Sequence, residues 1–273
     1  MSFENLHEDI IIEILLRLRA KSLVRFRCAS KGWLSLITDP RFAHRHLKRV
    51  SEHPQRVLSP SFTGIRSLGV DELCGDSFPL KELVLPFKDC DVSILGTCNG
   101  LVWVSRYEDR DFYIWNPSTA DCRKLPDPWI EPSWKGHRYL HGFGYDLSSD
   151  DYKVLLATSR DGFQPLVSAA QVQVFSLKTN SWEQIQYTAL DDPSEPVFWP
   201  WQSLGTFSNG ALHWKVEWRE PNFRHGIIAF DLAEEKFRDV PIPMDEARIY
   251  IHYLSNLGGR LCFTCDRNCH VEV

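Results

Sequence analysis

The first fifty residues carry apolar side chains at the period of short helices. Four of them share the i, i+3, i+4 and i+7 spacing of one helix face: Ile11, Ile14, Leu15 and Leu18. Three more lie on the other sides of the same segment: Ile10, Ile12 and Leu16. The pattern predicts a helix over residues 6–18, in which one apolar face packs into a core and another suits a partner protein.

Two further short helices are predicted over residues 21–28 and 31–37. Their apolar positions are Leu23 and Phe26, followed by Trp33, Leu34 and Ile37. Ser30 stands where its hydroxyl can cap the helix that begins at residue 31. The pair Asp39-Pro40 is expected to end that helix, because proline disfavours the helical conformation in the residue before it.

After about residue 56 the helical period gives way to short runs rich in Val, Ile, Phe, Tyr and Trp, which is typical of strands. Two kinds of strand pair recur. In the first kind a glycine turn joins two apolar runs, and Asn-Gly readily supplies the positive φ of such a hairpin: residues 98–103, 208–214 and 257–263. In the second kind an aromatic residue is followed by a turn-forming polar residue: 113–126, 172–182 and 227–237.

Joining one pair of each kind gives four-stranded units near residues 94–126, 142–186 and 203–241. In the middle unit, the stretch Gly142–Asp146 and Asp150–Val154 takes the place of the glycine hairpin. Repetition at about 50 to 60 residues is typical of the blades of a β-propeller. His270–Val273 reads as the start of another strand, so we expect a ring of blades that is incomplete at the C-terminus.

The composition is that of a globular protein, with 43% hydrophobic and 25% charged residues over a length that suits a small module and one larger domain. Residues 1–50 contain ten Lys/Arg and five Asp/Glu, which gives them a net charge of +5. The whole chain has a net charge of −5, so residues 51–273 carry −10. The basic side chains fall between apolar positions and form no continuous stripe. This favours solvated helix faces over nucleic-acid binding.

Eight cysteines could form disulfides in a secreted protein. The sequence has no recognisable signal peptide, no apolar run of about 18 residues and no usable Asn-x-Ser/Thr acceptor, so we expect free thiols and no membrane span. Cys98 and Cys262 are expected to serve as small core residues.

One cluster has the composition of a zinc site: Cys262, Cys265, Cys269 and His270. In a strand, however, Cys262 and Cys265 face opposite sides of the sheet, and no second Cys-x-x-Cys pair exists. This favours an interpretation without a metal.

Motifs of catalysis are missing from the sequence as well. It contains no nucleophile elbow, no His-Glu-x-x-His and no motif of a ligase that carries ubiquitin on its own cysteine, so we expect neither catalytic residues nor a cofactor. Gly142 and Gly144 lead into a turn and not into a helix that could bind phosphate. His213 is interpreted as a packed strand residue and not as a general base.

The first segment resembles the F-box, the module that docks a Skp-type adaptor onto a cullin-based ubiquitin ligase. The positions that match span residues 4–48: Leu6, Ile14-Leu15, Leu18, Lys21-Ser22-Leu23, Arg25-Phe26-Arg27-Cys28, Lys31, Trp33 and Leu36-Ile37. The family usually has Leu-Pro where this sequence has Leu6-His7 and Leu18-Arg19. The resemblance implies these adaptor contacts: Leu6, His7, Ile11, Ile14, Leu15, Leu18, Leu23, Cys28, Trp33 and Leu36.

The rest of the chain resembles the domain found behind the F-box in the large plant F-box families, including S-locus F-box and kelch-like members. The matching blocks are Cys98–Leu101, Trp115–Thr119, Gly142–Asp146, Asp151–Val154, Ser181-Trp182, Asn209–Trp214 and Ala229–Leu232. The resemblance implies an α+β multidomain protein, with a small three-helix F-box over residues 1–50 followed by an all-β, β-propeller-like domain over 51–273.

Three proline-rich insertions interrupt the strand pattern, at residues 127–135, 191–201 and 218–224. They hold side chains of the kind that interface hot spots favour: Trp129, Trp134, Trp199, Trp201, Trp218 and Arg219. We interpret them as candidate contacts for a target protein. Rings that merely cover the rim of the scaffold would give the same pattern, and the sequence leaves both interpretations open.

The resemblances together imply a substrate-recognition subunit of an SCF-type ubiquitin ligase, located in the cytoplasm or nucleus. Its partners would be a Skp-type adaptor, a cullin reached through that adaptor, and an unidentified target protein. Its role would be to bring the target protein close to a separately recruited ubiquitin-conjugating enzyme, without catalysis of its own. The alternatives are a decoy F-box protein that cannot bridge adaptor and target, and a propeller lectin or enzyme with a helical head.

Overall fold

A computed structural model describes residues 8–51, 56–61, 64–69, 80–85, 87, 92–106, 111–129, 138–159, 171–185, 204–218, 224–242, 249–257, 259–267 and 270–272. Its contacts divide the chain into two compact units, Met1–Asp89 with Trp115–Cys122 and Cys90–Ile114 with Arg123–Val273. The domain boundary expected at residue 50 stays a prediction.

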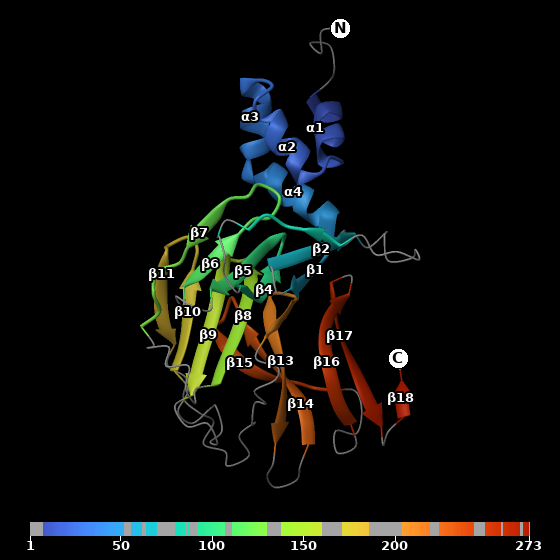
Figure 1. Ribbon diagram of the computed structural model, residues 1–273, viewed down its shortest axis with the longest axis vertical. Helices are drawn as coiled ribbons and strands as arrows, with labels where there is room; N and C mark the ends of the chain where they lie inside the picture. Colours follow the sequence, from blue (N-terminus) through green and yellow to red (C-terminus); the bar gives the residue numbers. More distant parts are fainter. Residues whose placement is uncertain are drawn as a thin grey trace. The chain divides into compact units, whose positions relative to one another are not determined.

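Within the described residues the N-terminal region forms four helices (Figure 1): α1 (Glu8–Leu16), α2 (Ala20–Phe26), α3 (Lys31–Thr38) and α4 (Pro40–Ser51). The sequence predicted only three, so the expected helix count is wrong. Asp39-Pro40 does end α3, but the same pair starts α4, because the Asp39 carboxylate accepts the Arg41 N–H at 2.7 Å and Pro40 occupies the first helical position. The predicted Ser30 cap of α3 is confirmed, since its hydroxyl accepts the Trp33 N–H at 3.1 Å.

The helices share a small apolar core. Its buried members come from three of the helices: Leu15 and Leu16 of α1, Leu23 of α2 and Phe42 of α4. The Leu18 carbonyl and the His46 ring nitrogen Nε2 lie 2.7 Å apart, which ties α4 to the turn after α1. We call residues 8–51 the helical module.

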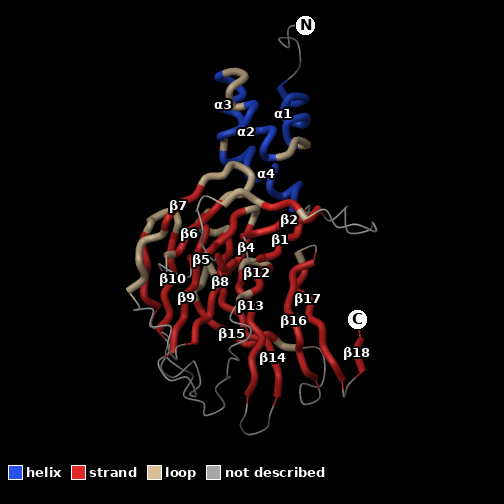
Figure 2. The backbone as a smooth tube through the Cα atoms, in the orientation of Figure 1, coloured by secondary structure: helices blue, strands red, loops and turns tan. Residues whose placement is uncertain are grey.

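The remaining described residues form strands in five sheets (Figures 1 and 2). In chain order the first sheet holds β1 (Arg56–Ser61), β2 (Gly64–Gly69) and β3 (Lys81–Glu82); the second β4 (Val92–Cys98), β5 (Leu101–Arg106), β6 (Phe112–Trp115) and β7 (Cys122–Lys124); the third β8 (Arg138–Asp146), β9 (Asp151–Ser159), β10 (Gln171–Ser176) and β11 (Ser181–Ile185); the fourth β12 (Thr206–Ser208), β13 (Ala211–Trp218), β14 (Arg224–Asp231) and β15 (Lys236–Val240); the fifth β16 (Ile249–Leu257), β17 (Arg260–Arg267) and β18 (His270–Glu272). Strands adjacent in the chain are neighbours in every sheet. The second, third and fourth sheets confirm the three predicted four-stranded units.

The predicted turn chemistry is also confirmed. Asn99 and Gly100 have φ of 52° and 81° in the β4–β5 turn, and Asn209 and Gly210 repeat this geometry between β12 and β13. In the second kind of turn, the Asn116 side chain accepts the Ser118 N–H at 2.9 Å. Local side-chain chemistry therefore sets where each hairpin reverses.

Successive sheets pack face to face through apolar cores. Trp103 of β5, Phe143 of β8 and Phe175 of β10 are buried between the second and third sheets. Trp214 and Phe230 are buried between the third and fourth, and Ile251 lies between the fourth and fifth. The second to fifth sheets are thus held together by their own side chains, as blades of a propeller are.

Gly142 and Gly144 make the close approach of two sheets possible. A Cβ atom on Gly144 would lie 2.5 Å from the Phe207 ring, and one on Gly142 would lie 2.5 Å from the Leu212 side chain. Both glycines are in β8, so they serve packing, in agreement with the interpretation that they are not part of a nucleotide-binding loop.

A buried ion cluster also joins the third and fourth sheets. Lys153 Nζ lies 3.1 Å from Asp146 Oδ2 within the third sheet, and it donates to Glu235 Oε1 at 2.9 Å and to the Leu232 carbonyl at 2.7 Å. Burial opposes the charge on Asp146, but hydrogen bonds from Ser149, Ser148 and Lys153 outweigh it and hold the carboxyl pKa well below its usual range. Burial likewise opposes the charge on Lys153, yet its bonds to Glu235 and Asp146 raise its pKa.

The cysteines depart from the prediction at one position. Cys98 is buried as expected, and burial raises its thiol pKa. Cys262 is only half-buried, whereas Cys265 packs in the core with Ile227 and Ile251. The expectation that Cys262 is a core residue is therefore wrong, because the inward side of β17 carries Cys265 instead.

Candidate interaction surfaces

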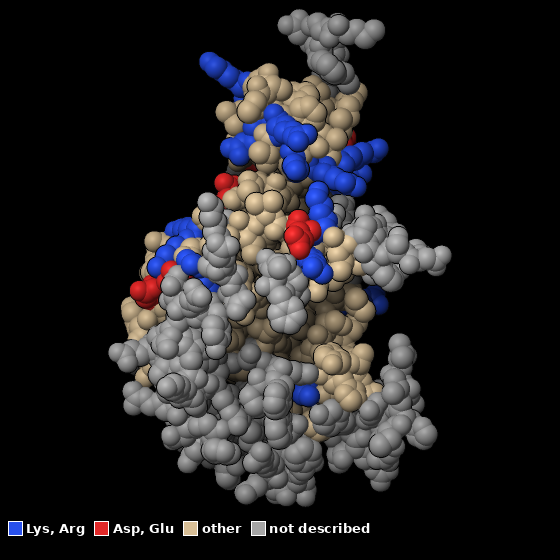
Figure 3. All heavy atoms as spheres, in the orientation of Figure 1, with Lys and Arg blue, Asp and Glu red and all other residues tan. Residues whose placement is uncertain are grey.

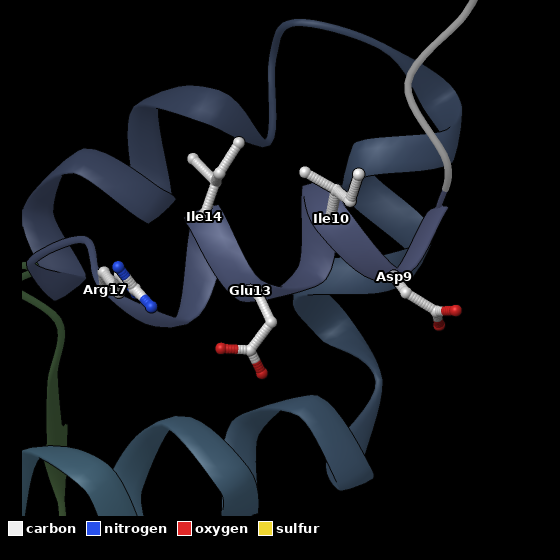
Figure 4. Close-up of a pocket in the computed structure, with 5 residues that line it drawn as sticks. All are labelled: Asp9, Ile10, Glu13, Ile14 and Arg17. Carbon is white, nitrogen blue, oxygen red and sulfur yellow. The ribbon is translucent and has the colours of Figure 1, made fainter.

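Helix α1 has two apolar sides, of which only one is buried. Leu15 and Leu16 are 1% and 3% exposed, whereas Ile10 and Ile14 are each 50% exposed. Figure 4 shows Ile10 and Ile14 one turn apart, projecting from the same side of α1. A hollow on this surface is lined by Asp9, Ile10, Glu13, Ile14 and Arg17. The helix therefore presents an apolar row to its surroundings, with charged residues beside it.

The grouping expected from periodicity is wrong at two of these positions. Ile14 was expected on the same face as Leu15, but it points outward, whereas Leu16, expected on another side, is in the core. In so short a helix, the core includes the adjacent positions 15 and 16, and a strict three-four spacing does not reveal this.

Glu13 links α1 to α4. Its two carboxylate oxygens each lie 3.2 Å from an arginine nitrogen, one from Arg45 and one from Arg49. All three side chains are close to half exposed, so each pair contributes at most about 1 kcal/mol to stability. The contacts orient the two helices while leaving the Ile10 and Ile14 side of α1 uncovered.

The α2–α3 corner carries further exposed apolar groups. The Phe26 and Trp33 rings meet edge to face with centroids 5.3 Å apart, and Phe26 and Leu34 are exposed. Lys and Arg side chains are spread over the helices (Figure 3). The helical module thus combines exposed apolar side chains with basic ones, which suits contact with another protein.

The predicted adaptor contacts fall into three groups. Leu6 and His7 lie outside the described residues. Leu15 and Leu23 belong to the core, where little of either side chain is accessible. The other six are at least partly exposed: Ile11, Ile14, Leu18, Cys28, Trp33 and Leu36. Three apolar residues that are not among the predicted adaptor contacts are also exposed: Ile10, Phe26 and Leu34.

The predicted target contacts are described at one side chain. Trp129 is 67% exposed and follows β7. The backbone of Trp218 ends β13, but its side chain is outside the description, as are the other members of this set: Trp134, Trp199, Trp201 and Arg219. Their role stays a prediction.

Among the described residues, the candidate groups for metal binding and for acid-base catalysis are not arranged as such sites. No three His, Cys, Asp or Glu side chains among them lie close enough to share a metal ion, while Cys269 is outside the description and leaves the zinc question a prediction. His213 is packed in β13 with Nδ1 3.2 Å from the Thr206 carbonyl, and burial lowers its pKa. None of the described helices is long and apolar enough to cross a membrane.

Comparison with known proteins gives two family matches. Residues 3–45 match the F-box domain, and residues 75–273 match the F-box associated beta propeller domain. Among curated proteins of Arabidopsis thaliana, the F-box protein CPR1 is 32% identical over 94% of this chain and 66% of its own length. An F-box/kelch-repeat protein is 28% identical over 96% of this chain and 72% of its own length, and another F-box protein is 30% identical over 97% and 68%.

The chain thus spans about two thirds of the length of these relatives. Among solved structures, TolB from Acinetobacter baumannii aligns with 79% of this chain and 47% of its own, with 8% identity and a TM-score of 0.45, which is too low to support an argument. The two domain matches and the relatives agree with the helical module and the repeated sheets, and the chain belongs to the family of F-box proteins that carry an F-box-associated β-propeller domain.

Proposed function

We propose that this protein is a substrate receptor of an SCF-type ubiquitin ligase, in the cytoplasm or nucleus. In this proposal the helical module docks a Skp-type adaptor and, through it, a cullin, while the β domain holds a target protein for ubiquitination. The contribution of the chain is to raise the local concentration of the target near a separately recruited conjugating enzyme. Membership of the F-box family supports the adaptor role.

The observation that carries the proposal is the uncovered apolar row of α1. Ile10 and Ile14 are each 50% exposed, while Leu15 and Leu16 of the same helix are buried. Covering apolar surface is favourable by roughly 25 cal/mol per Å². A partner that covers this row and the Phe26–Trp33 corner would bury apolar surface that the module itself leaves in water.

Co-purification with a plant Skp-type adaptor tests this role. Ile14→Asp should weaken the complex at least about tenfold, because it places a charge on the apolar row without entering the core. The matched control is Leu147→Asp, which makes the same kind of change at an exposed leucine of the β8–β9 turn and should leave the complex intact. Leu15→Asp is a poor probe, because it would disrupt the core of the module.

Two results would count against the receptor role. If folded wild-type chain forms no complex with the adaptor, the decoy alternative takes its place. If Ile14→Asp and Leu147→Asp bind the adaptor equally well, docking does not use the outward side of α1.

A further inference from the structure

The segment after β7 is fixed against the third sheet. Leu125 is buried, the Pro126 carbonyl accepts the indole N–H of Trp182 at 2.8 Å, and the Trp129 backbone N–H donates to Gln173 Oε1 at 3.1 Å. Trp182 and Gln173 are themselves buried. Side chains of β10 and β11 therefore bind the backbone of this segment at Pro126 and Trp129.

Trp129 projects from this fixed backbone into solvent. Trp129 is 67% exposed, whereas Trp103, Trp182 and Trp214 are buried between sheets. A large ring on a backbone that is already ordered loses little conformational entropy when a partner covers it. This is the combination that makes a tryptophan an efficient binding residue.

Two exposed amides lie on the same sheet face as the anchor of Trp129. Gln184 pairs directly with Gln173 across β10 and β11, and Gln171 is two residues from Gln173 on the same strand. Because side chains alternate along a strand, all three share one face, and Gln171 and Gln184 are exposed. The face next to Trp129 therefore offers neutral hydrogen-bonding groups.

The spacing of these amides suits an extended protein chain. Gln171 and Gln184 are diagonal cross-strand neighbours, whose separation is about 7–8 Å. Backbone groups that face the same way in an extended segment are about 6.8 Å apart, which is two residues of strand. Both amides can therefore reach the main chain of one bound segment.

We infer that Trp129, Gln171 and Gln184 form a contact surface for an extended segment of the target protein. An apolar or aromatic side chain of that segment covers the Trp129 indole, and its main chain bonds the two amides. The inference rests on the proposed receptor function and assigns to it one place on the third sheet.

A random-peptide display library selected on the full-length chain supplies the probe. Peptides with an apolar or aromatic anchor should be selected, and their affinity should fall at least about tenfold in Trp129→Ala and by less in the Gln171→Ala, Gln184→Ala double variant. The control is Leu147→Ala, an equally exposed apolar residue in the β8–β9 turn of the same sheet, which should bind the peptides unchanged. Thermal unfolding of each variant checks that the fold is intact.

Equal peptide affinity in wild type and Trp129→Ala would overturn the inference, as would a selection that yields no peptide. Binding of oligosaccharides on an array, lost in Trp129→Ala, in place of peptide binding would also overturn it. Adaptor co-purification on the same variants separates the two proposals. If the adaptor binds but peptide affinity does not depend on Trp129, the receptor function is kept and the proposed contact surface is rejected. If no adaptor binds, the receptor function is rejected.

Discussion

The helical module and the β domain differ in how many of their large apolar side chains they bury. In the β domain many of the largest are fully buried, among them Trp103, Trp214 and Phe230, although Trp129 is exposed. In the module four apolar side chains are buried, while Ile10, Ile14, Phe26 and Leu34 are exposed. A region of about 40 residues is close to the lower limit for independent folding. The comparison indicates that the β domain is stabilised by its own sheets, and we expect the module to gain stability when a partner covers its exposed apolar side chains.

The charges repeat this contrast. In the module, Glu13 forms ion pairs with Arg45 and Arg49 that are in contact with water. Lys153 and Asp146 are paired in the interior, with side chains only 11% and 3% exposed. Removing one partner of a buried pair leaves an uncompensated charge, whereas removing an exposed one changes little.

The largest effect is expected for Lys153→Met. The change leaves the Asp146 carboxylate buried without its cation, so the free energy of unfolding should fall by about 3–5 kcal/mol, measured by urea denaturation at pH 7. Lys178→Met is the matched control, because Lys178 is exposed and its Nζ donates to the Ser149 carbonyl at the surface. It should cost less than about 0.5 kcal/mol. A similar decrease in the free energy of unfolding in both variants would show that the buried ion cluster stabilises the fold no more than an exposed lysine does.

The neighbouring residues Ile14 and Leu15 test the two sides of α1. Leu15→Ala opens a cavity in the small core and should destabilise the module by about 2–5 kcal/mol, whereas Ile14→Ala should cost far less. Hydrogen exchange of the α1–α4 amides in the full-length chain measures both. Adaptor binding should protect the α1–α4 amides less in Ile14→Ala than in wild type. Equal protection in the two variants without adaptor would contradict the assignment of inner and outer sides.

The sequence was sufficient where local chemistry decides the structure. Asn99-Gly100 and Asn209-Gly210 fix their hairpins through positive φ, and this made the second and fourth sheets predictable. It was insufficient where two signals compete, as at Pro40, which stops one helix and starts the next. The outward position of Ile14 and the burial of Leu16 depend on where α2 and α4 pack, which no spacing within α1 contains.

The candidate target surface shows the same limit. Trp129 was predictable as an exposed loop tryptophan, because its proline-rich insertion has no strand pattern. Gln171 and Gln184 were not, since their role depends on the pairing of Gln173 with Gln184 and on the bond from Gln173 to the Trp129 backbone. The first pairing lies within one hairpin, but the bond to Trp129 joins residues 44 positions apart, and only the fold brings them together.

A pH effect of intermediate size is expected at His141 in the β domain. Burial lowers its pKa to about 4, below the value of about 6.5 in the unfolded chain. The unfolded state therefore binds the proton first as pH falls, so stability is complete above about pH 6.5 and decreases towards pH 4. Between pH 7.5 and 5 this site should cost about 2 kcal/mol. His141→Gln lacks this titration, so the free energy of unfolding that wild type has in excess of the variant should decrease by that amount when the pH falls from 7.5 to 5. A difference that does not change with pH would show that His141 is not the source of the effect.

Two glycines should respond with opposite signs to the same substitution. Gly144→Ala puts a Cβ 2.5 Å from the Phe207 ring and should destabilise the β domain by about 1–3 kcal/mol. Gly32 in α3 has only the Ser30 hydroxyl oxygen near its Cβ position, at 3.9 Å. Gly32→Ala should stabilise the module by about 0.5–1 kcal/mol, because it restricts the unfolded chain. Thermal unfolding gives the first value and hydrogen exchange of α3 the second. Stabilisation in both would refute the close approach at Gly144.

The smallest effect concerns Arg19, where other family members usually have proline. Arg19 is the N-cap of α2 with φ of −67° and ψ of 146°, and its side chain makes no capping bond. Proline fixes φ near −65°, so Arg19→Pro should stabilise the module by about 0.4–1 kcal/mol through the unfolded state. Arg27→Pro at the other end of α2 is the control, because it removes the bond from the Arg27 N–H to the Leu23 carbonyl and should destabilise. Slower exchange of the α2 amides in Arg19→Pro, and faster exchange in Arg27→Pro, is the expected result. Faster exchange in both would mean that the departure from the family pattern at residue 19 suits this chain better than proline does.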